Sequence, residues 1–145
     1  MKVMLDTNVF NHLLEGSIDL ASIPGDWEPV ITHLQNDEIE RTSDPTKRKA
    51  LQAMVIATVT VKVATESAVW GTSRWGEAKW SGPASQYNTL KTQLDAEKRR
   101  PSNTNDALIA DTCIQNGFLL VTNDQALTKV ATANGCSVRD LRTKR

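Results

Sequence analysis

Apolar and polar positions along the chain fall into blocks that predict short buried strands, each followed by an amphipathic helix. Residues 2–5 are apolar and β-prone, as expected of a buried strand. A short helix follows, which Thr7 and Asn8 can cap and which Gly16 stops. Its apolar side chains recur at helical spacing: Val9, Phe10, Leu13 and Leu14. The first segment therefore reads as strand, turn and helix.

The end of the chain repeats this order more clearly. "TNDALIADTCIQNG" predicts a helix that closes on Gly117, "FLLVT" a buried strand, "NDQALTKVATANG" a second helix and "CSV" a short final strand. Strands that alternate with helices are typical of a parallel sheet with helices on both faces. We therefore expect the α/β class, with a parallel sheet at its centre.

The middle of the chain carries weaker signals. Residues 29–32 predict a second strand and "THLQNDEIER" a helix. A longer helix should begin at Pro45, capped by Ser43 or Asp44, and its tail at 59–63 alternates like a strand. We expect another strand near 68–70 within a Trp-containing excursion around 65–84. "SQYNTLKTQLDAEKRR" then predicts a helix that Pro101 ends.

Size and composition indicate one globular domain spanning residues 1–145. The chain has 145 residues, and 39% of them are hydrophobic. Seventeen basic and 17 acidic residues cancel, so a polyanion partner would be held by a local basic rim or through metal ions. Cys113 and Cys136 lack zinc-site spacing and are expected to be buried thiols. No apolar run is long enough for a membrane span or a leader, which favours the cytoplasm and no membrane partner.

Acidic residues recur where the predicted strands end. Asp6 follows the first strand, Asp124 follows the strand at 118–121, Asp106 opens the helix after Pro101, and Glu38 lies beyond the second strand. The carboxyl ends of neighbouring parallel strands face one crevice, so these acids could converge. Clustered carboxylates raise one another's pKa, a conflict that a hard cation such as Mg²⁺ or Mn²⁺ resolves. Such a site suits phosphodiester hydrolysis, because the metal activates a water.

A simpler interpretation stands beside this one. Asp6, Asp106 and Asp124 each lie near a predicted helix start, where a carboxylate caps free N–H groups for about 0.5–2 kcal/mol. Glu38 alone would be an ordinary helix-surface residue. Residue chemistry by itself leaves capping and metal binding both open.

A family resemblance separates these alternatives. The segments "MLDTNVF", "THLQNDEI", "NDALIADTCIQNG" and "FLLVTNDQAL" resemble, in spacing and order, the four acidic motifs of the PIN domain (PilT N-terminus) family, across essentially the whole chain. The resemblance implies a three-layer α/β/α sandwich with a central, mostly parallel sheet of four to five strands. It also implies a metal-dependent endoribonuclease that hydrolyses RNA by a metal-activated water, commonly as the VapC-type toxin of a toxin–antitoxin pair.

By the same resemblance, Asp6, Glu38, Asp106 and Asp124 are the catalytic acids and the ligands of Mg²⁺ or Mn²⁺. Glu40 is the alternative second acid. Asp111, part-way round the helix from Asp106, should point elsewhere. The supporting residues that would orient carboxylates or substrate by hydrogen bonds are Thr7, Asn8 and Thr122. An antitoxin that blocks the crevice and a homodimer are partners implied at the level of the family.

Two basic clusters could contact RNA. They contain Lys47, Arg48 and Lys49, and Lys98, Arg99 and Arg100. A solvated helix end explains such clusters equally well, whereas a rim on RNA phosphates would weaken as salt rises. The residues that we expect to contact RNA are Arg41, Lys47, Arg48 and Arg74. His33 is expected to be structural, because Mg²⁺ prefers oxygen ligands.

Two other functions compete with the nuclease. A PIN-like fold could serve as a non-catalytic RNA-binding or scaffold module, although such a module has no need of acids at all four motifs. An aspartyl phosphatase with Asp6 as nucleophile ranks lower, because that chemistry usually needs a second acid where Asn8 stands. The sequence therefore favours the ribonuclease.

Overall fold

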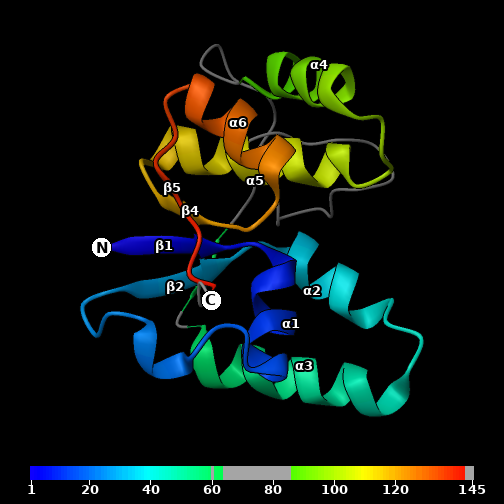
Figure 1. The fold of residues 1–145 in the computed structure, drawn as a ribbon, viewed down its shortest axis with the longest axis vertical. Helices are drawn as coiled ribbons and strands as arrows, with labels where there is room; N and C mark the ends of the chain where they lie inside the picture. The colour runs from blue at the N-terminus through cyan, green and yellow to red at the C-terminus, as the bar shows by residue number, and fades with distance from the viewer. Residues whose placement is uncertain (60, 64–85, 143–145) are drawn as a thin grey trace.

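The computed structural model describes residues 1–59, 61–63 and 86–142. Their helices and strands alternate along the chain, as the sequence predicts (Figure 1). The strands are β1 (Lys2–Leu5), β2 (Glu28–Ile31), β3 (Val61–Lys62), β4 (Leu119–Val121) and β5 (Val138–Arg139). The helices are α1 (Thr7–Glu15), α2 (His33–Glu40), α3 (Pro45–Thr58), α4 (Tyr87–Glu97), α5 (Asn103–Asn116) and α6 (Gln125–Ala133), with a 3₁₀ turn at Leu20–Ser22.

The strands form one sheet in the order β3-β2-β1-β4-β5, and every described pair is parallel. β1 is central, with Val3 opposite Pro29 of β2 on one side and Leu119 of β4 on the other. The chain runs outward from β1 through β2 to β3 and then returns to β4 on the opposite side of β1. Strand order therefore reverses between β1 and β4, which is where open α/β sheets bind ligands.

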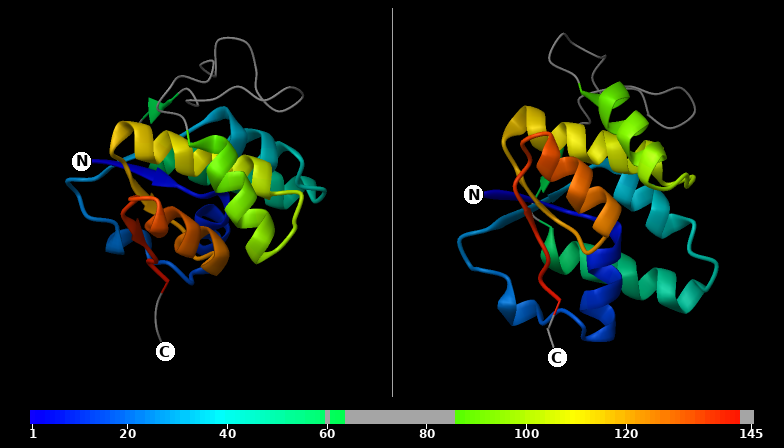
Figure 2. Two further views of the ribbon diagram at one scale, coloured as in Figure 1. Left: turned by 90° about the horizontal axis from the view of Figure 1, so that it is seen from above. Right: turned by 45° about the horizontal axis from the view of Figure 1, so that its top comes forward.

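Helices cover both faces of this sheet (Figure 2). α1 packs on α2 and α3 on one side, and α4 packs on α5 and α6 on the other. The expected three-layer α/β/α sandwich with four to five mostly parallel strands is thus confirmed. Among the described residues, no helix combines the length and the apolarity of a bilayer span.

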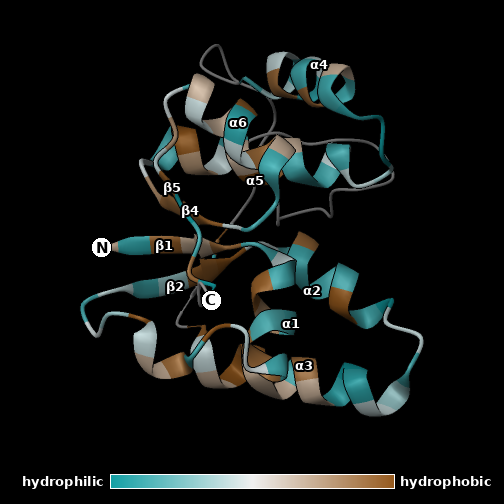
Figure 3. Cartoon of the chain, viewed as in Figure 1, coloured by the Kyte–Doolittle hydropathy of each residue, from teal (hydrophilic) through white to brown (hydrophobic). Residues whose placement is uncertain are grey.

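The strands are apolar because both of their faces are buried. In β1, Val3 and Leu5 pack into the core beneath α1 and α3, whereas Met4 packs into the core beneath α5 and α6. β4 divides in the same way, with Leu120 on the opposite face from Leu119. Hydrophobic colour accordingly concentrates on the strands and on the inward faces of the helices (Figure 3). Two-sided burial explains why these strands read as continuous apolar runs.

Several element boundaries differ from the sequence prediction, mostly because a polar side chain caps a helix. The cap of α1 is Asp6, which the sequence analysis left open as a cap, and not Thr7 or Asn8. Thr32 lies outside β2 and forms a capping box with Gln35 at the start of α2. α5 begins at Asn103, so Asp106 lies within its first turn and does not open the helix. The caps Asp6 and Thr32 satisfy free N–H groups and shift the boundary by a residue, whereas Ser102, which precedes α5, makes no side-chain cap hydrogen bond.

Other boundaries agree more closely. α3 begins at Pro45 under an Asp44 cap, and Gly117 ends α5 in the left-handed conformation, with φ of 68°. The alternation at 59–63 corresponds to β3, and the last strand is Val138–Arg139, slightly later than "CSV". The strand expected near 68–70 and the Trp-containing excursion around 65–84 lie outside the described residues.

Candidate functional site

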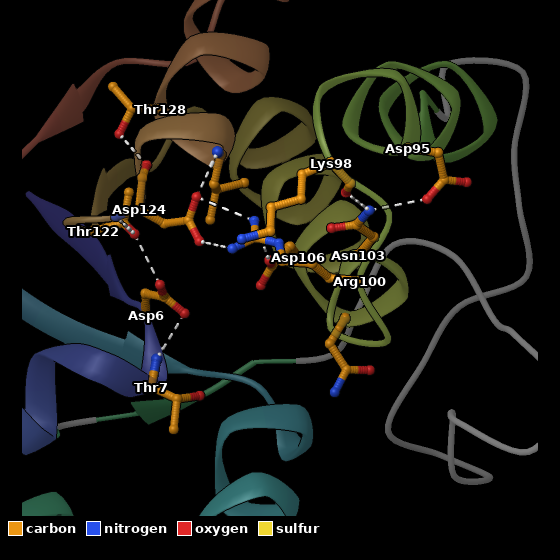
Figure 4. A network of polar contacts seen from close by, with 12 residues as sticks. Asp6, Thr7, Asp95, Lys98, Arg100, Asn103, Asp106, Thr122, Asp124 and Thr128 are labelled. Atoms are coloured by element: carbon orange, nitrogen blue, oxygen red, sulfur yellow. Dashed lines mark hydrogen bonds and ion pairs between the residues drawn. The ribbon is translucent and has the colours of Figure 1, made fainter.

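The four predicted acids act on one another at the carboxyl end of the sheet. Asp6 directly follows β1, Asp124 follows β4, Asp106 belongs to the first turn of α5, and Glu38 belongs to α2. Charge on Glu38 and on Asp124 raises the pKa of Asp6, after the larger effect of burial. We call the place where these four acids meet the crevice. It lies at the ends of β1 and β4, where strand order reverses, and Figure 4 shows three of its acids, Asp6, Asp106 and Asp124.

Asp6 caps α1 and also belongs to the acid cluster. Its Oδ1 accepts the backbone N–H of Thr7 at 2.8 Å, which caps α1, and its Oδ2 accepts the hydroxyl of Thr122 at 2.8 Å. The side chain is buried, and burial is the main cause that raises its pKa to about 6. The charges of Glu38 and Asp124 raise it further, while the Thr122 and Thr7 hydrogen bonds oppose the shift. Asp6 is therefore both a cap and a member of the acid cluster.

Thr122 joins the two central strand ends. Its hydroxyl donates to Asp6 and accepts the backbone N–H of Asp124 at 3.2 Å. Whether Thr122 orients a catalytic carboxylate stays a prediction. Thr7 contributes its backbone N–H, and the Thr7 hydroxyl is buried with no partner among the described residues. Asn8 is exposed on α1, and its contribution to the site stays a prediction.

Asp106 is the acid with the most strongly raised pKa of the cluster. Burial, and then the charges of Asp6, Glu38 and Asp124, raise the pKa of Asp106 to about 8, against a smaller opposing effect of Arg100. Residue Asp106 is only 7% exposed. A carboxyl in this environment holds a proton at neutral pH and releases it when a cation approaches.

Asp124 is held by an arginine. The Arg100 guanidinium donates from Nη1 to Oδ2 of Asp124 at 2.7 Å and from Nη2 to Oδ1 at 3.2 Å, while Oδ1 also accepts the Leu127 N–H at 3.0 Å. Burial pushes the pKa of Asp124 up, but the bonds from Arg100 and Leu127 outweigh it and lower the pKa overall. Nη2 of Arg100 lies 3.9 Å from Oδ2 of Asp106 as well. Arg100 is thus the cation of the crevice (Figure 4).

Sequence reasoning missed this role of Arg100. The sequence predicts that the basic cluster containing Arg100 is a solvated helix end or a rim that contacts RNA, and not a partner of the acids. Arg100 and Asp124 are 24 residues apart and belong to different connections of the fold, so no helix or strand periodicity pairs them. The signal available in the sequence is that Arg100 directly precedes Pro101 and lies shortly before the helix that contains Asp106.

Glu38, the acid expected on α2, carries a charge that acts on two of the other acids. Its Oε1 accepts the side-chain amide of Asn105 at 3.0 Å, and its charge raises the pKa of both Asp6 and Asp106, after the effect of burial. Glu40, the alternative, is exposed. One turn before Glu38, the Gln35 side chain is fully buried and donates to the carbonyl of Leu5 at 3.0 Å. Gln35 and Asn105 are site residues that the sequence analysis did not identify.

Two residues named beside the acids lie in other surroundings. Asp111 is fully buried and accepts the backbone N–H of Gln86 at 2.9 Å and the Gln115 amide at 3.3 Å. As expected, it points away from the crevice and ties the start of α4 to α5. His33 is buried at the start of α2.

The residues expected to contact RNA are spread over α2, α3 and the excursion. Arg41 and Lys47 are exposed, and Arg48 donates to the Thr42 carbonyl at 3.0 Å, which steadies the loop between α2 and α3. Arg74 lies outside the described residues. A separate groove of about 510 Å³ borders the crevice, and its lining consists of Glu97, Lys98, Arg100, Asp124, Gln125, Ala126 and Lys129.

The donors at the crevice are carboxylate oxygens, which suit Mg²⁺ or Mn²⁺. Their mutual repulsion is the strain that a divalent cation relieves, so the chemistry of the donor set fits such an ion. Within the part of the chain that the structure describes, however, no three His, Cys, Asp or Glu side chains stand close enough together to hold one ion. Asp124 is instead hydrogen-bonded through both carboxylate oxygens to Arg100.

Comparison with known proteins finds likeness only at the level of structure. No protein-family model and no curated protein sequence matches the chain. VapBC2 from Rickettsia felis, bound to a DNA fragment from its promoter, is similar with a TM-score of 0.61 and 16% identity over 97% of this chain and 98% of that one. VapBC-1 from nontypeable Haemophilus influenzae gives 0.60 and 16% over the same shares.

VapBC-5 from Mycobacterium tuberculosis, a member of the VapBC family of toxin–antitoxin systems, is similar with a TM-score of 0.54 and 20% identity over 98% of both chains. The VapC component of such pairs is a PIN domain. The chain therefore has a PIN/VapC-like fold, as its motifs predict.

Proposed function

We propose that this chain is a Mg²⁺- or Mn²⁺-dependent endoribonuclease that hydrolyses RNA phosphodiesters. The observation that carries the proposal is the convergence of Asp6, Glu38, Asp106 and Asp124 from separate elements on one crevice, where burial and mutual charge raise the pKa of Asp6 and Asp106. A protein that only needed helix caps has no reason to gather four carboxyls in this way. The PIN/VapC-like fold supports the same function.

Each acid has a distinct part in this proposal. Asp6, Glu38, Asp106 and Asp124 would hold the ion, which when bound supplies Lewis-acid activation of water and neutralises charge on the phosphate. Thr122 and the Thr7 N–H fix both oxygens of Asp6, so its lone pairs are already oriented. Asp106 holds a proton at neutral pH and gives it up as positive charge enters the crevice. Exposed Arg41 and Lys47 are proposed to contact RNA phosphates.

The same fold in VapBC structures supports a partner as well. We propose that the chain is the toxin of a toxin–antitoxin pair, that an antitoxin segment closes the acidic crevice, and that the toxin forms a homodimer. Co-expression with the product of a neighbouring small open reading frame should relieve growth arrest caused by the chain. Arrest that persists in the presence of this product would remove it as the antitoxin.

One observation favours a second function, the non-catalytic RNA-binding or scaffold module. The Arg100 guanidinium hydrogen-bonds to both carboxylate oxygens of Asp124. Among the described residues, no three His, Cys, Asp or Glu side chains are arranged to hold an ion. A permanently neutralised crevice would suit a scaffold. The aspartyl phosphatase finds less support, because both oxygens of Asp6 accept hydrogen bonds and Asn8 stands where a second acid is needed.

The test is cleavage of a mixed pool of structured RNAs by the purified chain, in Mn²⁺ or Mg²⁺ against EDTA, with Asp6→Asn alongside. Cleavage that needs the metal and disappears in Asp6→Asn is the expected result. Cleavage retained in Asp6→Asn would point to a contaminating nuclease or to another site. RNA binding without cleavage in any metal would favour the scaffold.

A matched pair of variants tests the assignment of the second acid. Glu38→Gln should reduce cleavage strongly, because Glu38 faces Asp6 and Asp106. Glu40→Gln, the same change on the exposed surface of the same helix, should not. Equal losses in the two variants would contradict the assignment of Glu38.

A further inference from the structure

We propose that Arg100 is a resident cation of the acidic crevice that competes with the divalent metal for Asp124, so that metal loading displaces its guanidinium. The inference rests on the proposed function, because it concerns the same acids. It adds a residue that the acidic motifs do not contain, and it predicts that this residue weakens metal binding.

The first support is the contact itself. Two guanidinium nitrogens of Arg100 reach the two oxygens of Asp124 at 2.7 and 3.2 Å, and Nη2 also lies 3.9 Å from Asp106. A parallel fork of this kind is among the strongest carboxylate contacts in proteins. It takes up the lone pairs that a metal ion would need, and its positive charge repels a second cation.

The second support is that the turn carrying Arg100 is held in place. Asn103 is fully buried, and its side-chain amide donates to Oδ1 of Asp95 at 2.9 Å and to the carbonyl of Lys98 at 2.8 Å. The backbone N–H of Asn103 donates to the carbonyl of Arg100 at 3.1 Å. These bonds fasten the connection between α4 and α5 with Arg100 at the crevice (Figure 4). The ion pair is thus a product of the fold.

The third support is that the guanidinium can leave without disturbing the core. About a quarter of the Arg100 side chain is exposed, at 26%. Its Nε is buried with no hydrogen-bond partner among the described residues, so the pair leaves one donor unsatisfied. The bordering groove of about 510 Å³ is lined by Arg100 itself, and Lys98 and Lys129 also line it. A rotation of the side chain into this groove would release Asp124 and leave the turn intact.

Competition makes a prediction about affinity that does not depend on catalysis. Mn²⁺ binding, measured by calorimetry and by electron paramagnetic resonance at one pH and salt concentration, should be about tenfold tighter or more in Arg100→Gln than in the wild type. Arg99→Gln is the matched control, since it removes the same charge from the adjacent, exposed position. Arg100→Lys, which keeps the charge and loses the fork, should fall between Arg100→Gln and the wild type.

The outcomes separate the two proposals. Equal Mn²⁺ affinity in Arg100→Gln and Arg99→Gln, or weaker binding in Arg100→Gln, overturns the competition. If Asp6→Asn abolishes binding in that case, the metal site and the proposed function stand without it. Binding that Asp6→Asn leaves intact places the metal elsewhere and overturns both, as does a lack of binding in every variant. If Arg100→Gln does not fold, by circular dichroism, Arg100→Lys decides by the same comparison with Arg99→Gln.

Discussion

Helix α5 carries two buried carboxyls in opposite circumstances. Asp111, in the middle of the helix, is fully buried and is met by donors, the backbone N–H of Gln86 and the amide of Gln115. Asp106, one turn and a half earlier, is nearly as buried, but its neighbours include three further carboxyls. Burial first, and then those charges, raise the pKa of Asp106 to about 8.

The difference shows that burial alone does not mark a functional acid. A buried carboxyl that is met by donors is a structural tie, because its charge is already compensated. A buried carboxyl that lies near other carboxyls is destabilised by charge repulsion, and binding of a cation or a proton relieves this repulsion. Each prediction below tests this contrast, in order of expected effect.

The largest effect is expected on catalysis. Asp106→Asn should lower the rate of metal-dependent RNA cleavage by about 10²-fold or more, since even residues that merely support a metal ligand account for 10- to 100-fold. The fold should persist, because the amide has the same shape as the protonated carboxyl and is likewise uncharged. Cleavage per mole of folded protein is the measurement, and activity close to that of the wild type would exclude Asp106 from the site.

The second effect is expected on stability. Asp111→Ala should lower the free energy of unfolding by about 1–3 kcal/mol, because the Gln86 N–H loses its acceptor and the start of α4 loses a tie to α5. Urea unfolding followed by circular dichroism measures the change. The cleavage rate of the folded fraction should be that of the wild type. A loss of cleavage without a loss of stability would contradict the division between the two carboxyls.

The smallest effect is a dependence of stability on pH. The pKa values of Asp6 and Asp106 rise from 3.8 to about 6 and about 8 on folding, so the folded state binds more protons than the unfolded state between these limits. The free energy of unfolding in EDTA should therefore fall as pH rises from 5 towards 8. The pKa of Asp124 is lowered, and its stabilising contribution is lost only at acid pH, outside this window.

Asp106→Asn is the control for this experiment, because it removes the larger of the two shifts. Its stability in EDTA should vary less between pH 5 and 8 than that of the wild type, and Asp111→Ala should keep the wild-type slope. Parallel curves for wild type and Asp106→Asn would show that Asp106 does not carry the raised pKa.

Much of the fold could be predicted from the sequence because its signals are local. Strands such as β1 and β4 are buried on both faces and read as apolar runs, and Gly117 ends α5 where the backbone turns left-handed. Boundaries shifted where a side chain caps a helix, as Thr32 and Asp6 do. A residue with a hydroxyl or carboxylate at a strand end looks the same in the sequence whether or not its side chain caps the next helix.

The candidate site was predictable in its acids and not in their partners. The carboxyl-end rule and the motifs place Asp6, Glu38, Asp106 and Asp124 together. The partners depend on how distant segments pack: Asn105 bonds Glu38 across 67 residues, and Arg100 bonds Asp124 across 24. Contacts between residues so far apart depend on how the chain folds in three dimensions, and the periodicity of the sequence carries no information about them.

The sheet order also determines when the crevice can exist. The Thr122–Asp6 hydrogen bond joins residues 116 positions apart, since β1 pairs with β4 only after the chain has travelled out to β3 and back. Synthesis on the ribosome delivers Asp6 long before Asp124, and contacts of such long range are slow to form in folding. The crevice therefore cannot be complete until the segment that contains β4 and Asp124 has been made and has paired with β1.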